Sequence, residues 1–251
     1  KRTHIFDGKL VCAISQEKKK KKASVVQSLI ESKFVLPPGR NVSFLYIANH
    51  LELRETHSLA SLLLEASQFD RSGYTFYGHT KGVTRGGAEV MPAVQLWTEA
   101  MYHFNLDRMD QIRMLLKSHP VVGCFKRRGR FSHFPKISTW HYSGTFYWFR
   151  NSDLFSRKFW TQVPQIRYGA ESYPSIVFKD NEAGVIFGDN FQDGYKLEYL
   201  HKVLRKDAYF ANLLPKSEFN NPDRSKARVL RSVPTLDQKP VTPARRMDNR
   251  R

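Results

Sequence analysis

Three short stretches carry the polar residues whose types and spacing could support ligand binding or catalysis. They are His79-Thr-Lys-Gly82, Trp140-His-Tyr-Ser-Gly144 and Tyr168-Gly-Ala-Glu171. The first offers an imidazole and a cation, which could meet an anionic ligand such as a phosphate. The other two offer His141 and Glu171, either of which could take a proton as a general base.

The first stretch follows an expected strand directly. Residues 74–77 are aromatic or β-branched, which favours a strand, and Gly78 breaks it before His79. Open α/β sheets present ligand-binding groups at the carboxyl ends of their strands. The alternative is a surface loop that happens to hold a His and a Lys.

The first 85 residues alternate between strand and helix patterns. Strands are expected at 4–15, 42–48 and 74–77, and helices at 23–33 and 59–66. This order predicts βαβ units and a mixed, mostly parallel sheet flanked by helices.

The later elements place the other two stretches. A strand is expected at 121–125, followed by a basic loop at 126–134 and an aromatic strand at 140–150 that Ser143-Gly144 interrupt. Glu171 should lie between turn signals. Further helices are expected at 93–104, 153–161 and 196–209. Another helix is expected to begin at a cap, Asn105 or Asp107, and to end at about Lys117. Short strands are expected at 175–178 and 184–187.

Composition predicts one globular α/β domain over residues 1–214 and a basic, disordered tail over 215–251. The formal net charge is +18, of which the lysines from Lys18 to Lys22 supply +5 and the tail +6. This distribution predicts contact with an anionic membrane or another polyanion, without specific nucleic-acid binding. The two cysteines, Cys12 and Cys124, lie in apolar runs, which predicts buried thiols in the reduced state in a cytoplasmic protein, without a disulfide or metal framework.

Together the three stretches resemble a family of bacterial glycosyltransferases linked to lipopolysaccharide or surface-polysaccharide biosynthesis. That family carries a strand followed by His-Thr-Lys-Gly, then a Trp-bearing helix and a His-Tyr-Ser-Gly-x-Phe-x-Trp strand. The similarity runs from about Arg2 to Asp189.

The resemblance implies a GT-A-like, Rossmann-related fold and transfer of a hexose from a nucleotide-diphospho-sugar to a glycan acceptor. The metal-binding Asp-x-Asp of that fold does not occur in this chain, which leaves use of Mn²⁺ or Mg²⁺ open, with His79 as one conceivable ligand. Charge on the donor would instead be met by a loop whose members are His79, Thr80, Lys81, Gly82 and Arg85, with further charge from the basic residues at 126–130.

The resemblance also suggests Glu171 as the catalytic base, with His141 as the alternative, and both could equally be structural. An apolar platform for a sugar ring would comprise Trp140, Tyr142, Ser143, Gly144 and Trp148. Core packing is the alternative for these aromatic residues. Two other functions remain open at this point: a non-catalytic polyanion-binding protein, and a transferase-like fold that only binds a sugar nucleotide.

Overall fold

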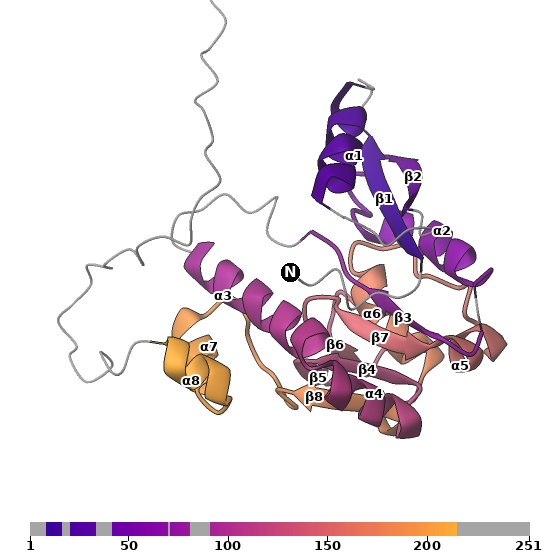
Figure 1. Ribbon diagram of the computed structural model, residues 1–251. Coiled ribbons are helices and arrows are strands. Elements are labelled where there is room, and N and C mark those ends of the chain that lie inside the picture. Colours follow the sequence, from indigo (N-terminus) through magenta and orange to yellow (C-terminus); the bar gives the residue numbers. More distant parts are fainter. Residues whose placement is uncertain (1–8, 17–20, 34–41, 70, 81–90, 215–251) are drawn as a thin grey trace, which may run out of the picture.

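The computed structural model describes residues 9–16, 21–33, 42–69, 71–80 and 91–214, without the side chains of residues 21, 22 and 33 (Figure 1). Several sequence predictions fall outside these ranges. They concern residues 4–8, Lys18 to Lys20, Lys81, Gly82, Arg85 and the segment 215–251.

A parallel pair of strands opens the described chain. β1 (Leu10–Gln16) and β2 (Val42–Ala48) pair in register over seven residues, and α1 (Lys21–Lys33) connects them. The expected βαβ unit is confirmed here. α2 (Thr56–Ala66) follows and packs against β1.

The main sheet has the order β3-β7-β4-β8 and is only partly parallel. Its strands are β3 (Tyr74–Tyr77), β7 (Tyr147–Arg150), β4 (Val121–Cys124) and β8 (Ala183–Phe187). β7 lies between β3 and β4 and is antiparallel to both, whereas β4 and β8 are parallel. The prediction of a mostly parallel sheet was therefore wrong, because the aromatic stretch folds back before its second half enters the sheet.

That fold-back is a small antiparallel pair. β5 (Lys126–Arg128) pairs with β6 (Trp140–Tyr142). Residues 126–128 were expected in a basic loop and are instead a strand, whose first residue, Lys126, is fully buried. As expected, Ser143-Gly144 separate the two strands of the aromatic stretch.

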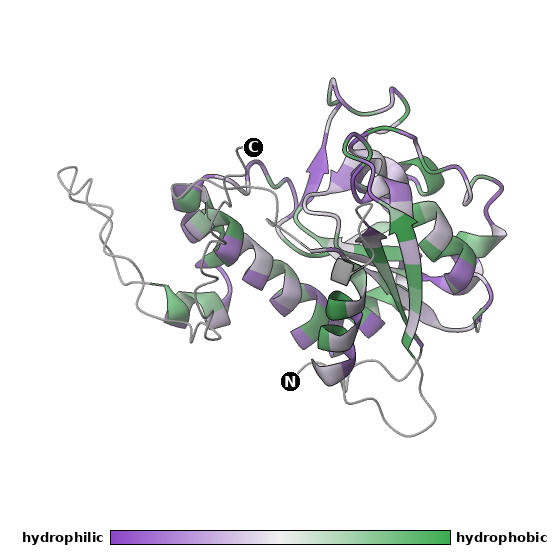
Figure 2. Cartoon of the chain, turned by 90° about the horizontal axis from the view of Figure 1, so that it is seen from above, coloured by the Kyte–Doolittle hydropathy of each residue, from purple (hydrophilic) through white to green (hydrophobic). Residues whose placement is uncertain are grey.

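Helices cover both faces of the main sheet. Neighbouring strand residues point to opposite faces: Tyr147 and Phe149 join a core cluster with α2 and α6 (Gly169–Val177), whereas Trp148 packs with α4 (Met109–Ser118). α3 (Met91–Tyr102), α7 (Leu197–Leu204) and α8 (Ala208–Leu213) enclose a further cluster around Phe104 and Phe125. Figure 2 shows the apolar residues concentrated along the central strands.

Several helix predictions need correction. Residues 175–177 belong to α6 rather than to a strand, because a short apolar run has no periodicity that separates a strand from a buried helical turn. The expected cap at Asn105 or Asp107 is replaced by a π-helical turn, His103–Asp107. The helix expected at 153–161 is α5 (Asn151–Ser156), and the last one is divided into α7 and α8.

Candidate functional site

The three stretches meet at one edge of the main sheet. β3 and β4 both run antiparallel to β7, and β8 runs parallel to β4, so β3, β4 and β8 end at the same edge. His79 follows β3 there, and the turn at residues 143–146 precedes β7. This is the edge where open α/β sheets bind ligands.

His79 bridges the first two stretches. Because Tyr77 pairs with Tyr147, the chain beyond β3 continues alongside the turn before β7. The His79 ring lies 3.2 Å from the Gly144 carbonyl oxygen through Nε2 and 3.1 Å from the Thr80 carbonyl oxygen through Nδ1. Two acceptors can both be satisfied only by a doubly protonated imidazolium, whereas a neutral ring donates to one.

Gly144 holds the turn in a conformation that suits glycine. Its φ is +101°, and a Cβ placed on it would lie 2.2 Å from Met101 Sδ. Thr145, the next residue, also has a positive φ of 66°. The backbone therefore passes close over Met101 and directs the Gly144 N–H toward the third stretch.

Glu171 accepts the hydrogen bond from the Gly144 N–H. It lies in the first turn of α6, not between turns as expected, and its Oε1 accepts a hydrogen bond of 3.3 Å from Gly144 N. A carboxylate in the first turn of a helix is favoured by the helix dipole. Its side chain is 17% exposed, which leaves it accessible to a ligand.

Thr56 fixes the start of this helix, a role that the sequence did not reveal. It is fully buried, and its hydroxyl accepts a hydrogen bond of 3.0 Å from Ala170 N. Gly169 completes the contact, because a Cβ there would lie 2.0 Å from the Pro164 carbonyl oxygen. No local signal links Thr56 to Ala170, since 114 residues separate them.

His141 lies behind Glu171, with its Nε2 3.7 Å from Glu171 Oε1. Burial, together with the charges of Arg127 and His133, lowers the pKa of His141 to about 3. The imidazole is therefore neutral near pH 7, and the contact is not an ion pair. Its Nδ1 is buried without a hydrogen-bond partner. A ring this hard to protonate makes a weak base, which favours Glu171 for that role.

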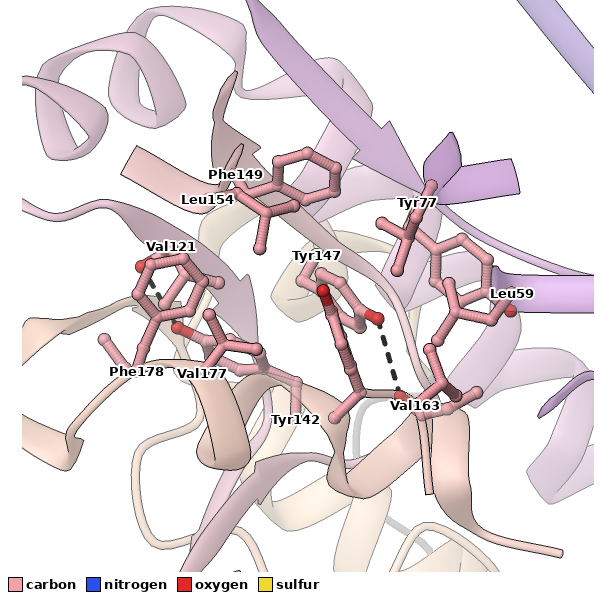
Figure 3. Close-up of a cluster of buried hydrophobic side chains, with 14 of the residues drawn as sticks. Leu59, Tyr77, Val121, Tyr142, Tyr147, Phe149, Leu154, Val163, Val177 and Phe178 are labelled. Carbon is pink, nitrogen blue, oxygen red and sulfur yellow. Dashed lines mark hydrogen bonds between the residues drawn. The ribbon is translucent and has the colours of Figure 1, made fainter. Parts of the chain in front are cut away.

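The predicted sugar platform is wrong for its three aromatic residues. Trp140, Tyr142 and Trp148 are only 1%, 0% and 5% exposed. Figure 3 shows Tyr142 inside the core, where its hydroxyl donates to the Gly184 and Val121 carbonyl oxygens. Their apolar area packs the core, so their rings cannot offer a face to a ligand. Ser143 is also buried, whereas Gly144 lies at the site through its backbone.

Two of the basic residues expected to supply charge are held in an ion-pair network. Lys126 Nζ lies 2.6 Å from Asp180 Oδ1 and donates to the Asp180 and Ala183 carbonyl oxygens. Arg128 pairs with Asp180 and Asp189. Burial lowers the pKa of Lys126 despite this pairing. Their ion pairs connect β5 to Asp180 and Asp189, which lie before and after β8 in the sequence.

The described part of the chain contains no group of three or more His, Cys, Asp or Glu side chains that could hold a metal ion. A separate surface cavity of about 400 Å³ lies at the end of β8, between the loop at 188–192 and α7, and includes Lys202 and Lys206. Asp189 lines it, whereas His79, Gly144, His141 and Glu171 do not.

Both cysteines are free thiols, and Cys124 is buried, whereas Cys12 is partly exposed. Burial raises the pKa of the Cys124 thiol to about 12, which makes it unreactive. Within the described residues, no helix is both long and apolar enough to cross a membrane. Searches against protein-family models, curated proteins and solved structures found no match to this chain.

Proposed function

We propose that this protein is a glycosyltransferase that moves a sugar from a nucleotide-diphospho-sugar to a hydroxyl of a glycan acceptor. One observation carries the proposal. Three stretches far apart in the sequence converge on a single hydrogen-bonded unit, in which His79 contacts Gly144 and Gly144 contacts Glu171. The proposed fold is GT-A-like, and the site's position at the carboxyl edge of β3 agrees with ligand binding in α/β sheets generally.

In the proposed reaction Glu171 is the general base. It takes the proton of the acceptor hydroxyl as that oxygen bonds to the anomeric carbon, while the bond from that carbon to the diphosphate breaks. The nucleoside diphosphate leaves with the electron pair, and the anomeric configuration inverts. The Gly144 N–H holds the carboxylate in place, at 3.3 Å.

The donor's phosphates belong on the His79 side of the site. His79 and Thr80 lie there, and we assign the cation that follows them in the sequence, Lys81, to the departing diphosphate, together with Gly82 and Arg85. Lys81→Ala should therefore abolish transfer while leaving the thermal unfolding temperature unchanged. Wild-type turnover in this variant would contradict the assignment.

The basic segments suggest where the enzyme works. We propose that Lys18 to Lys22 and the segment 215–251 attract the protein to an anionic membrane surface at the cytoplasmic side, where polysaccharide precursors would be presented. Sedimentation with vesicles of anionic and of neutral lipid at several salt concentrations tests this. Equal binding to both would contradict it.

Glu171→Gln tests the catalytic proposal directly. A panel of nucleotide sugars, with and without Mn²⁺ or Mg²⁺, first identifies a donor by thermal shift, and product formation is then measured. We expect the variant to bind the donor but to lose transfer by about 100-fold or more. Glu198→Gln, which makes the same change at an exposed position on α7, is the control.

Three outcomes would contradict the proposal. Full activity of Glu171→Gln would place the base elsewhere. Donor binding by the wild type with no transfer to any acceptor would favour a fold that only binds a sugar nucleotide. Strongly salt-dependent binding to random DNA without a response to any donor would favour a polyanion-binding protein.

A further inference from the structure

Arg127 differs from the two basic residues beside it. On β5 the side chains of Lys126 and Arg128 share one face, and both pair with Asp180. Arg127 points to the opposite face, where it is directly across from His141 on β6. Within the described residues it makes no ion pair, and its guanidinium carbon lies 4.9 Å from the centroid of the Phe131 ring.

A second possible donor, the imidazole of His133, lies on the same side of the Phe131 ring. The His133 ring packs against Phe134 at 4.7 Å and Tyr168 at 4.5 Å, between ring centroids, and makes no hydrogen bond to a described residue. Phe131 connects the cluster, because its ring contacts Arg127, His133 and His141. Burial, and then the charge of Arg127, lowers the pKa of His133, so two groups that disfavour each other's charge lie close together.

The cluster borders the Glu171 site. Tyr168, which His133 contacts, precedes α6 by one residue, and Glu171 lies in the first turn of that helix. His141 lies between Arg127 and Glu171, within 3.7 Å of the carboxylate. Among the described residues the Arg127 guanidinium has no carboxylate partner, and next to a second donor it is suited to bind an oxyanion through charge-assisted hydrogen bonds.

We infer that Arg127 and His133 form an oxyanion-binding subsite beside Glu171, which takes a phosphate or carboxylate group of a bound ligand. A bound anion would accept hydrogen bonds from the Arg127 guanidinium and the His133 ring, and its charge would offset the effect of Arg127 that lowers the pKa of His133. As the acceptor of the proposed transfer, the ligand would be an acidic glycan or a sugar phosphate, and that identification rests on the proposed function.

The test uses the full chain and sodium phosphate, with sodium chloride holding the ionic strength constant because the chain carries +18. Calorimetry measures the Kd, and NMR follows the His133 ring signals. We expect a saturable shift at His133 and a Kd at least about tenfold weaker in Arg127→Gln. Arg113→Gln, which removes the same charge from an exposed position on α4, should bind like the wild type.

Sodium acetate replaces phosphate in a second titration, and the anion that shifts His133 at lower concentration identifies the group. His133→Gln, which leaves Arg127 in place, should also weaken binding and guards against misfolding of Arg127→Gln. Equal weakening by Arg127→Gln and Arg113→Gln, or no change at His133 with either anion, would overturn the inference. No donor or transfer is involved, so failure of the proposed reaction would leave this result intact.

Discussion

At residue 144, backbone conformation and packing both require a glycine. The residue combines a φ of +101° with a neighbouring Met101 Sδ that leaves no room for a side chain. It also links His79 to Glu171 through its own carbonyl and N–H groups. One residue without a side chain therefore joins the two sides of the candidate site.

Gly144→Ala should cost more stability than the same change at Gly129. Gly129 has a φ of +119° but nothing within 4 Å of an added Cβ, so Gly129→Ala incurs only backbone strain, about 1–2 kcal/mol. Gly144→Ala adds overpacking against Met101, a further 1–3 kcal/mol, roughly. Urea denaturation measures both. Equal losses would show that Met101 yields to the new methyl group.

His141 should make the protein sensitive to acid. The unfolded chain protonates this imidazole below a pKa of 6.5, but the folded chain does so only near 3. Because the unfolded state binds the extra proton between these values, stability is full above pH 6.5 and falls as the pH drops toward 3. The loss is at most about 1.4 kcal/mol per pH unit.

His141→Phe keeps an aromatic ring between Phe131 and Phe134 and removes the titration. Its free energy of unfolding should therefore decline less steeply over this pH range, as measured by urea denaturation at several pH values. An unchanged slope in the variant would mean that other groups, such as Asp180 with its lowered pKa, account for the acid sensitivity.

Among the elements, the β5–β6 pair illustrates how one strand serves two purposes. Its inward face carries Lys126, whose ammonium lies over the Trp140 ring at 4.8 Å and whose side chain is 1% exposed. Its other face carries Arg127. Alternation along a strand thus assigns one cation to the core and the next to the surface of the site.

Asp180→Ala should destabilise the protein by about 1.5–3 kcal/mol, because it removes a charged partner of a buried ammonium. The Asp180 and Ala183 carbonyl oxygens still accept from Lys126, which limits the loss. Lys126→Met removes the buried charge, so Asp180→Ala should cost less stability in that background, where only the exposed pair between Asp180 and Arg128 is lost. A double-mutant cycle by urea denaturation measures the coupling energy between Lys126 and Asp180. Additive losses of stability would contradict a stabilising interaction between them.

Sequence reasoning located the individual elements better than their pairing. The strands at 42–48 and 74–77 were predicted with their observed bounds, because aromatic and β-branched runs lie between clear breakers. The partly antiparallel sheet and the helical position of Glu171 were not predicted, since both depend on contacts between distant residues. Thr56 and Ala170 are one such contact.

The composition of the candidate site was predicted in part. His79, Gly144, His141 and Glu171 were named from their residue types and are close together in the fold. The error over Trp140, Tyr142 and Trp148 has a simple cause. An aromatic ring fits a sugar-binding surface and a core equally well, and only the tertiary fold decides which one it occupies.

For the whole molecule, α8 is the last helix of the described chain, and it packs into a core cluster. Phe210 is fully buried and Leu214 is 7% exposed, both in the cluster around α3 and α7. A chain ending at residue 207 should therefore lose about 3–5 kcal/mol of stability relative to a chain ending at residue 214. Thermal and urea denaturation of the two truncated chains compare them. Equal stability would show that α8 does not belong to the cooperative unit.

The β1–β2 pair has a consequence for how the native molecule opens. These strands form their seven-residue ladder with each other, and no described strand of the main sheet joins it. Their amide protons should therefore exchange with solvent deuterium through a local opening that leaves β4 and β7 closed. Native-state hydrogen exchange would then show two classes of protected amides, the slower class marking the sheet that carries His79 and Gly144.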